Sequence, residues 1–337
     1  AEVTASSNYC GGIVGYTLNS VFNCVSYGTI NGFVEAGGVA GLAFSLIQNC
    51  VNEGDVYGMQ YSGGIVGVTK NEIRNCRNRG FVWSTSMAGG ICGSFANFTA
   101  KLINCHNSGE VQSLELAGGI AGTTAFGRVI NCSNQGHVMG TFGGARCAGG
   151  IVGQAEKTLI HNCANTGTIN TQHAGNSAYV GGLVGLAKSG THIKNSINVG
   201  SVLDPTAISG ALVGNNRFDC TVNNCFWKQT GVEPYIVDAT GANDGTLLGC
   251  QTFGEAPGRL AAPVTIEGQT IEDLAEALNI WVVANRGITG GNPFRRWASG
   301  SSENYPAVIT SYWTDEGNYE TEWYSPGVSS FDIDSAA

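Results

Sequence analysis

The sequence predicts an all-β protein, built mainly as a right-handed parallel β-helix of about eight coils of 26–32 residues, with a small C-terminal α+β cap. Three observations carry this prediction. A glycine motif recurs along two thirds of the chain, an asparagine-cysteine motif follows its copies, and fixed residues in the second motif alternate with variable ones, which is the period of a β-strand. Right-handed winding is expected because parallel crossovers almost always have that hand.

The glycine motif, Gly-Gly-Φ-x-Gly with Φ an aliphatic residue, runs from Gly11–Gly15 to Gly181–Gly185, and a degenerate copy follows at Gly210–Gly214. Successive copies lie 26, 26, 26, 29, 31, 32 and 29 residues apart. Helical solenoids have repeats of similar length, but they require runs of helix formers, whereas Gly (51 of 337 residues) and Asn interrupt this chain every few positions. We therefore expect three short strands per coil.

The second motif, Φ-x-Asn-Cys-x-Asn-x-Gly-x-Φ, is clearest at Ile73–Val82 and Ile160–Ile169. Asn residues in register on stacked coils can pair amide to amide, and Asn tolerates the left-handed backbone of corners, a role that Gly is expected to share. The thiols are expected to be buried and free, with Ser196 replacing one of them. The predicted structural columns are Asn23, Asn49, Asn75, Asn104, Asn131, Asn162, Asn195 and Asn224, a further Asn column from Asn52 to Asn198, and Cys24, Cys50, Cys76, Cys105, Cys132, Cys163 and Cys225.

The C-terminal third departs from the repeat, which is expected to end near residue 230. Residues 231–310 are interpreted as a cap that covers the open end of the solenoid, with an independent small module as the alternative. Within it, residues 270–279 (TIEDLAEALN) predict a short amphipathic helix with Thr270 as its N-cap. The acidic, aromatic residues 311–337 are interpreted as a tail, an edge strand or a linker.

The two motifs together resemble the GLUG motif repeat of bacterial surface and secreted proteins. The resemblance covers about residues 10–230. It implies a secreted or cell-surface protein, often from gut bacteria, in which adhesion or binding is the usual role, and it brings no catalytic residues. Such repeats also occur in some IgA-specific metallopeptidases, but the His-Glu-x-x-His motif of a metallopeptidase is absent from the sequence.

Composition and charge exclude several classes of function. The net charge is −9 and the 16 Lys and Arg residues do not cluster, which argues against a nucleic-acid partner. No apolar run approaches the ~18 residues of a transmembrane helix. The start AEVTASSNYC shows no signal peptide and is interpreted as processed or trimmed. Five scattered His residues and the absence of a Cys-x-x-Cys pair argue against a metal site, and no cofactor is expected.

Catalytic carboxylates are the main alternative to examine, because parallel β-helices often carry carbohydrate-active enzymes. Asp55 and Glu110 fall in one outward column but lie two coils apart, roughly 10 Å, with Phe81 between them. We therefore predict solvated surface carboxylates and no catalytic residues. A carbohydrate-active enzyme remains the second alternative for the function.

The candidate binding residues lie where the repeat is longest. The stretch before the glycine pair grows from six residues to ten at Met139–Ala148 and to eleven at Asn170–Val180. Such insertions in neighbouring coils form one ridge, and insertions in repeat proteins often mark the binding face. The predicted ligand-binding residues are Phe142, Arg146, His173 and Tyr179, with neutral loop drift as the alternative. The predicted function is a non-catalytic adhesin or scaffold for a host or microbial glycan or surface protein; the first alternative is a spacer that presents another domain.

Overall fold

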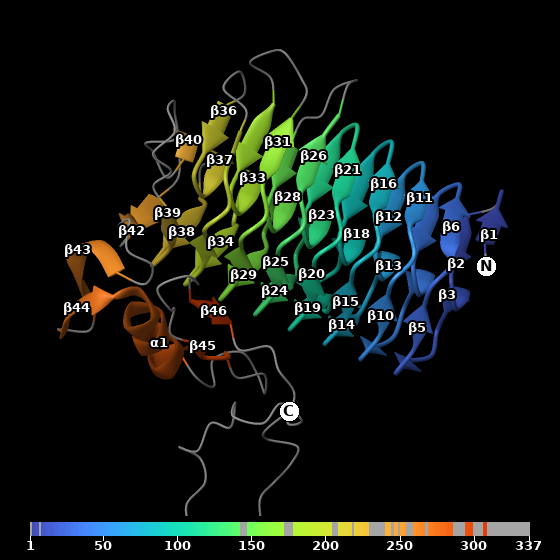
Figure 1. The fold of residues 1–337 in the computed structure, drawn as a ribbon, viewed down its shortest axis with the longest axis horizontal. Helices are drawn as coiled ribbons and strands as arrows, with labels where there is room; N and C mark the ends of the chain where they lie inside the picture. The colour runs from blue at the N-terminus through green and yellow to red at the C-terminus, as the bar shows by residue number, and fades with distance from the viewer. Residues whose placement is uncertain are drawn as a thin grey trace, which may run out of the picture.

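The computed structural model describes residues 2–6, 8–141, 147–171, 178–203, 208–217, 219–228, 240–243, 246–248, 250–253, 259–266, 269–285, 294–298 and 306–308. Most of these residues form a parallel β-solenoid, which confirms the predicted fold class (Figure 1). Its strands fall into five parallel sheets, named A to E in the order in which the chain enters them, and the smallest sheet has seven described strands. About seven turns are therefore complete in all five sheets.

Sheets A and B lie on one side of the solenoid. Sheet A consists of β1 (Glu2–Ala5), β6 (Thr29–Gly32), β11 (Val56–Gly58), β16 (Val82–Ser84), β21 (Val111–Ser113), β26 (Val138–Gly140) and β31 (Ile169–Thr171). Sheet B consists of β2 (Tyr9–Gly11), β7 (Glu35–Gly37), β12 (Tyr61–Gly63), β17 (Met87–Gly89), β22 (Leu116–Gly118), β27 (Cys147–Gly149), β32 (Tyr179–Gly181) and β36 (Ile208–Gly210).

Sheets C, D and E form the rest of each coil. Sheet C consists of β3 (Val14–Thr17), β8 (Ala40–Ala43), β13 (Val66–Thr69), β18 (Cys92–Ala96), β23 (Ala121–Ala125), β28 (Val152–Glu156), β33 (Val184–Lys188), β37 (Val213–Asn216) and β40 (Thr240–Asn243). Sheet D consists of β4 (Val21–Phe22), β9 (Ile47–Gln48), β14 (Glu72–Arg74), β19 (Lys101–Ile103), β24 (Arg128–Ile130), β29 (Leu159–His161), β34 (His192–Lys194), β38 (Thr221–Asn223) and β41 (Thr246–Leu248). Sheet E consists of β5 (Val25–Ser26), β10 (Val51–Asn52), β15 (Arg77–Asn78), β20 (His106–Asn107), β25 (Ser133–Asn134), β30 (Ala164–Asn165), β35 (Ile197–Asn198), β39 (Phe226–Lys228) and β42 (Gln251–Phe253).

The solenoid extends beyond residue 230, where the sequence repeat was expected to end. Strands β40, β41 and β42 pair in parallel with β37, β38 and β39, as in the earlier coils. The glycine motif is missing from this last coil, but Cys250 continues the cysteine column next to Cys225. The coil was missed because a strand can stack through backbone hydrogen bonds even where the repeat's marker residues have been replaced.

Two hydrophobic cores fill the coils, and glycine packing separates them. Closing aliphatics such as Val82 in sheet A face small residues such as Ala88 in sheet B, while sheets C, D and E enclose a second core. A Cβ at Gly64 would lie 2.1 Å from the Gly90 carbonyl oxygen and 2.2 Å from Asn78 Cγ. The motif glycines are thus required by close approach. The expected left-handed role is wrong for them, because Gly190 is the one glycine with positive φ in the described part of the chain.

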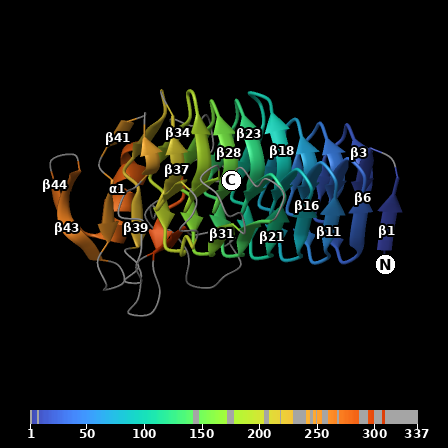
Figure 2. The same cartoon turned by 90° about the horizontal axis from the view of Figure 1, so that it is seen from above.

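The C-terminal elements pack against the flank of the solenoid as well as its end. The hairpin of β43 (Arg259–Ile266) and β44 (Gln269–Asp273) continues sheet E in antiparallel fashion from β42, at the end of the rod opposite the N-terminus (Figure 2). Helix α1 (Leu274–Asn285) and the two-stranded sheet of β45 (Trp297–Ala298) and β46 (Ala307–Val308) lie beside the coils (Figure 1). Their core includes Ile130, Ile197 and Phe226 of the solenoid.

The helix begins later than the sequence predicted. The expected short helix is present, but its predicted bounds of 270–279 and its predicted N-cap at Thr270 are wrong: Thr270 pairs with Thr265 in the hairpin, and α1 runs over 274–285. Asp273 is the N-cap, because its Oδ1 accepts a hydrogen bond of 2.8 Å from the Glu276 amide. Both residues suit a helix start, but the β-branched Thr270 fits the strand, and the buried face of the helix begins at Leu274.

Candidate functional site

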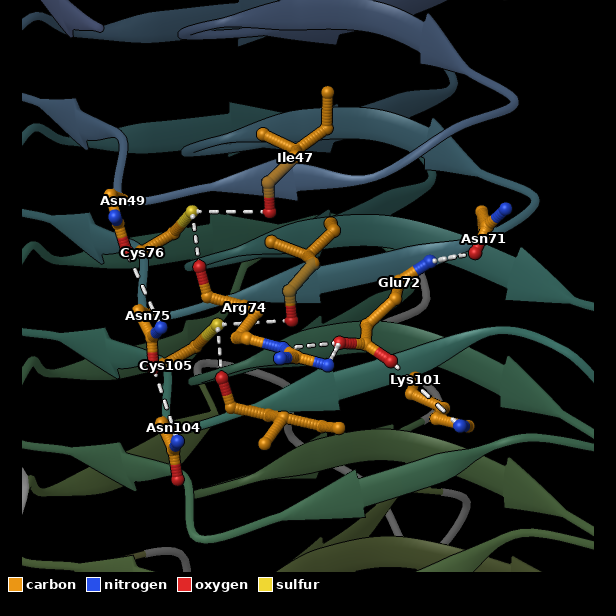
Figure 3. Close-up of polar contacts among 12 residues, drawn as sticks. Ile47, Asn49, Asn71, Glu72, Arg74, Asn75, Cys76, Lys101, Asn104 and Cys105 are labelled. Atoms are coloured by element: carbon orange, nitrogen blue, oxygen red, sulfur yellow. Dashed lines mark hydrogen bonds and ion pairs between the residues drawn. The ribbon is translucent and has the colours of Figure 1, made fainter. Parts of the chain in front are cut away.

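The first asparagine column forms a continuous ladder along eight coils. Each side-chain amide donates to the amide oxygen of the preceding coil, from Asn49 to Asn23 (3.1 Å) through to Asn224 to Asn195 (2.6 Å). All eight residues have positive φ, between 49° and 58°. Figure 3 shows Asn49, Asn75 and Asn104 of this ladder and the bonds between them. Asn is suited to the position because it tolerates the left-handed backbone and also binds the next coil, so the role of this column is structural.

The second asparagine column is fully buried beside the glycine pairs. Asn134, for example, donates through Nδ2 to the Gly136 carbonyl (2.9 Å) and to Asn165 Oδ1 (2.8 Å). Its own Oδ1 accepts from Asn107 Nδ2 (2.8 Å) and from the Gly136 amide (3.2 Å). The side chain thereby bonds the backbone of its own turn and the asparagines of both neighbouring coils. All of its hydrogen-bonding groups have partners, as a buried amide requires. These residues also offer no free group for a ligand.

The cysteine column lies on the inner side of the same segment, and all its thiols are free. Each buried Sγ contacts carbonyl oxygens of its own and the preceding coil, as Cys76 does with Arg74 and Ile47 (Figure 3). Burial raises the pKa of the Cys76 thiol well above its usual range, whereas the hydrogen bond from that thiol lowers the pKa of Cys50 to about 7. Ser196 takes the equivalent place with hydrogen bonds to Lys194 and from Cys163.

Of the predicted ligand-binding residues, Phe142, Arg146 and His173 lie outside the described residues. Tyr179 is described, and it belongs to strand β32 and not to a loop. Its ring is partly buried and packs with Leu116, Cys147 and Leu186. The predicted ridge therefore stays a prediction. Tyr179 itself lies on sheet B, next to Leu186 of sheet C.

The outward-facing columns of sheets B and C meet along the rod. A Cβ at Gly41 of sheet C would lie 2.6 Å from the Cys10 amide and 3.0 Å from the Glu35 carbonyl of sheet B, so the two sheets are in direct contact there. Side chains beside this contact come from both sheets, as the packing of Tyr179 with Leu186 shows. The sheet B column is Tyr9, Glu35, Tyr61, Met87, Leu116, Cys147, Tyr179 and Ile208, and the sheet C column is Tyr16, Leu42, Val68, Ser94, Thr123, Gln154, Leu186 and Asn215.

Aromatic rings gather where these columns reach the N-terminal coils. The ring centroids of Tyr9 and Tyr16 are 5.5 Å apart, and those of Tyr16 and Phe44 are 5.6 Å apart. The three side chains are 38%, 45% and 41% exposed, so their faces are accessible to a ligand. We call these three residues, together with Glu35 and Tyr61 of the adjoining sheet B column, the aromatic corner. Tilted contacts at these distances are favourable for aromatic pairs and hold the rings in place.

Glu35 is the charged group of the aromatic corner. It stands in register between Tyr9 and Tyr61. Its Oε2 atom is shielded from solvent and has no hydrogen-bond partner. Loss of hydration raises the pKa of this carboxyl, while a hydrogen bond from its own backbone amide and the more distant positive charge of Lys70 act in the opposite direction. An unpaired carboxylate oxygen that is shielded from water is costly to the fold.

The two carboxylates considered for catalysis both accept hydrogen bonds from neighbouring groups. Asp55 Oδ1 accepts a hydrogen bond of 2.9 Å from the Phe81 amide. Glu110 Oε1 accepts from Gln112 Nε2 at 2.6 Å and lies 3.7 Å from His137 Nδ1. Asp55 thus contacts Phe81, and Glu110 contacts His137, each in the next coil. No group of three or more His, Cys, Asp or Glu side chains suited to a metal ion occurs in the described ranges.

A half-buried histidine, whose ring nitrogens are both shielded from solvent, lies at the contact between the solenoid and the C-terminal segment. His161 lies beside the rings of Trp281 and Phe294, at centroid distances of 5.9 and 5.8 Å, and neither ring nitrogen has a hydrogen-bond partner. Burial lowers its pKa to about 3, and the nearby charge of Lys194 acts in the same direction. Trp297 Nε1 donates to Asn162 Oδ1 at 2.6 Å beside it. The group is a hydrophobic anchor for the C-terminal segment.

Comparisons with known proteins agree with the fold. The GLUG motif family matches residues 144–170. The chain carries a GLUG motif. The solved structures that resemble it include that of a putative immunoglobulin A1 protease from Bacteroides ovatus, with a TM-score of 0.52, 19% identity, and coverage of 80% of this chain and 87% of that chain. At this identity the likeness concerns the fold alone. No curated protein matches the chain.

In the described part of the chain no helix has the length and apolar character to span a bilayer.

Proposed function

We propose that this protein is a non-catalytic, secreted or cell-surface scaffold that binds a glycan at the aromatic corner. The observation that carries the proposal is the exposed row of Tyr9, Tyr16 and Phe44, with ring contacts of 5.5 and 5.6 Å. These residues lie on rigid, hydrogen-bonded strands or directly beside them, so little conformational entropy is lost when a ligand binds.

A glycan is the occupant that the chemistry of the corner favours. The C–H faces of sugar rings are apolar and their rims are polar, which matches broad aromatic faces beside a carboxylate. Glu35 supplies that carboxylate. Aromatic side chains give large contact area at low entropic cost. A protein interface would need on the order of 800 Å² per partner with an apolar centre, far more than three rings provide.

The absence of catalysis is part of the same proposal. Asp55 and Glu110 are engaged in hydrogen bonds, and the sequence has no His-Glu-x-x-His motif, which a metallopeptidase of that type requires. The name of the Bacteroides ovatus protein refers to a protease, and its likeness to this chain lies in the shared solenoid.

A glycan array with purified protein and matched variants tests the proposal. Tyr16→Ala combined with Phe44→Ala removes two of the three rings, while Tyr27→Ala removes a 75% exposed ring outside the corner. We expect the double variant to lose binding by at least about tenfold at an unchanged melting temperature, because stacking is worth about 1 kcal/mol or more per ring. The Tyr27 variant should bind like the wild type. Equal binding by the double variant and the wild type would refute the site.

A further inference from the structure

We infer that the aromatic corner selects glycans that carry a primary ammonium group, that is, unacetylated amino sugars. The inference rests on the proposed function and adds the chemical class of the ligand. It depends on the position of Glu35, whose side chain is half-buried, between two tyrosines in the same register.

The geometry places one carboxylate within a row of rings. Strands β2, β7 and β12 are adjacent in sheet B, and Tyr9, Glu35 and Tyr61 occupy the same register position. Neighbouring strands are about 4.8 Å apart, so the carboxylate of Glu35 lies within reach of both rings. Tyr16 contacts Tyr9 from sheet C at 5.5 Å. A cation bound here would meet a negative charge and aromatic faces together.

This combination favours an organic cation over a neutral sugar. An ammonium group donates charge-assisted hydrogen bonds to a carboxylate, which are roughly twice as strong as neutral ones, and it is attracted to aromatic faces. A hydroxyl group in the same place donates a neutral hydrogen bond. An acetamido group has lost the positive charge. The amine should therefore be preferred over both.

The chain itself leaves this partner position open. No ion pair of Glu35 within 4.0 Å occurs among the described residues, and Lys70 acts on it at longer range. A bare metal cation does not fit, because such ions take several oxygen or thiolate ligands and one carboxylate stands here.

Three oligosaccharides with the same β-1,4 backbone separate the possibilities. They carry an amine, an acetamido group or a hydroxyl at the second carbon: a glucosamine oligomer, an N-acetylglucosamine oligomer and a cello-oligosaccharide. Calorimetric titration of the wild-type protein should give a Kd about tenfold lower for the amine than for the other two. The preference should shrink as salt concentration rises, because the ion pair is partly screened.

Two charge-removing variants complete the experiment. Glu35→Gln keeps the shape and should bring the three Kd values within about twofold of one another, whereas Glu110→Gln removes an equal charge elsewhere and should leave the preference intact. Equal wild-type Kd values for all three ligands, or an amine preference that survives in Glu35→Gln, would overturn this inference alone. Failure of the protein to bind any of the three oligosaccharides or any glycan on the array would overturn the proposed function as well.

Discussion

Replacing Asn134 by alanine tests whether the second asparagine column holds the coils together. Its side chain makes four hydrogen bonds of 2.8–3.2 Å, two through Nδ2 and two through Oδ1, and is 0% exposed. At roughly 1 kcal/mol of net stabilisation per bond, Asn134→Ala should lower the free energy of unfolding by about 4 kcal/mol. The groups left unpaired are buried, so their desolvation adds to this loss.

Equilibrium unfolding in guanidinium chloride, followed by circular dichroism, measures the effect. Gln135 is the next residue and is exposed, so Gln135→Ala is the matched control and should change stability by less than about 0.5 kcal/mol. If Asn134→Ala and Gln135→Ala lie within 1 kcal/mol of each other, the ladder is not a main source of stability and the reasoning fails.

Three further predictions concern single residues. Asn104→Ala should cost more stability than Asn104→Gly, by about 1 kcal/mol. Both variants lose the same two ladder bonds, but φ is 54° and alanine alone is strained there; chemical denaturation compares the two. Asp273→Ala should cost about 1 kcal/mol through loss of the α1 cap, whereas Asp273→Asn should be nearly neutral; a thermal melt in which both equal the wild type contradicts this. The anchor at His161 should be fully stable above pH 6.5 and weaken as the pH falls from 6.5 toward its folded pKa of about 3, because protonation favours the detached state; tryptophan fluorescence of His161→Phe should lack this pH dependence.

The repeat made most of the solenoid predictable. In a solenoid each coil places equivalent residues in equivalent environments, so a column records burial directly in the sequence. The positive φ of Asn23 and the shielded thiol of Cys76 are both local consequences of that environment. The last coil was not predicted because its marker glycines are gone, although Cys250 remained as a signal.

The candidate site was harder to predict because it joins variable positions. Tyr9 and Tyr16 are seven residues apart on different strands, and the bend at Gly12 and Ile13 brings their outer faces together. Alternation within one strand shows which residues point outward, but it does not show that the outer faces of two sheets meet. Aligning the residue two places before each glycine pair with the residue after the third glycine would have found both columns. The docking of Arg295 on Asn131 depends on a contact 164 residues apart, which no local pattern encodes.

The contact between the C-terminal elements and the side of the solenoid divides the molecule into regions of unequal local stability. In most repeat proteins each unit touches its immediate neighbours alone, so either end can fray independently. Here the Arg295 amide reaches Asn131 and the Trp297 indole reaches Asn162, which ties the middle coils to the C-terminal elements as one cooperative unit. The coils that carry Tyr9 and Tyr16 lie outside this unit and should exchange their amide hydrogens fastest. A ligand on those rings would slow that exchange, so occupancy of the surface and order of the first coils are thermodynamically linked.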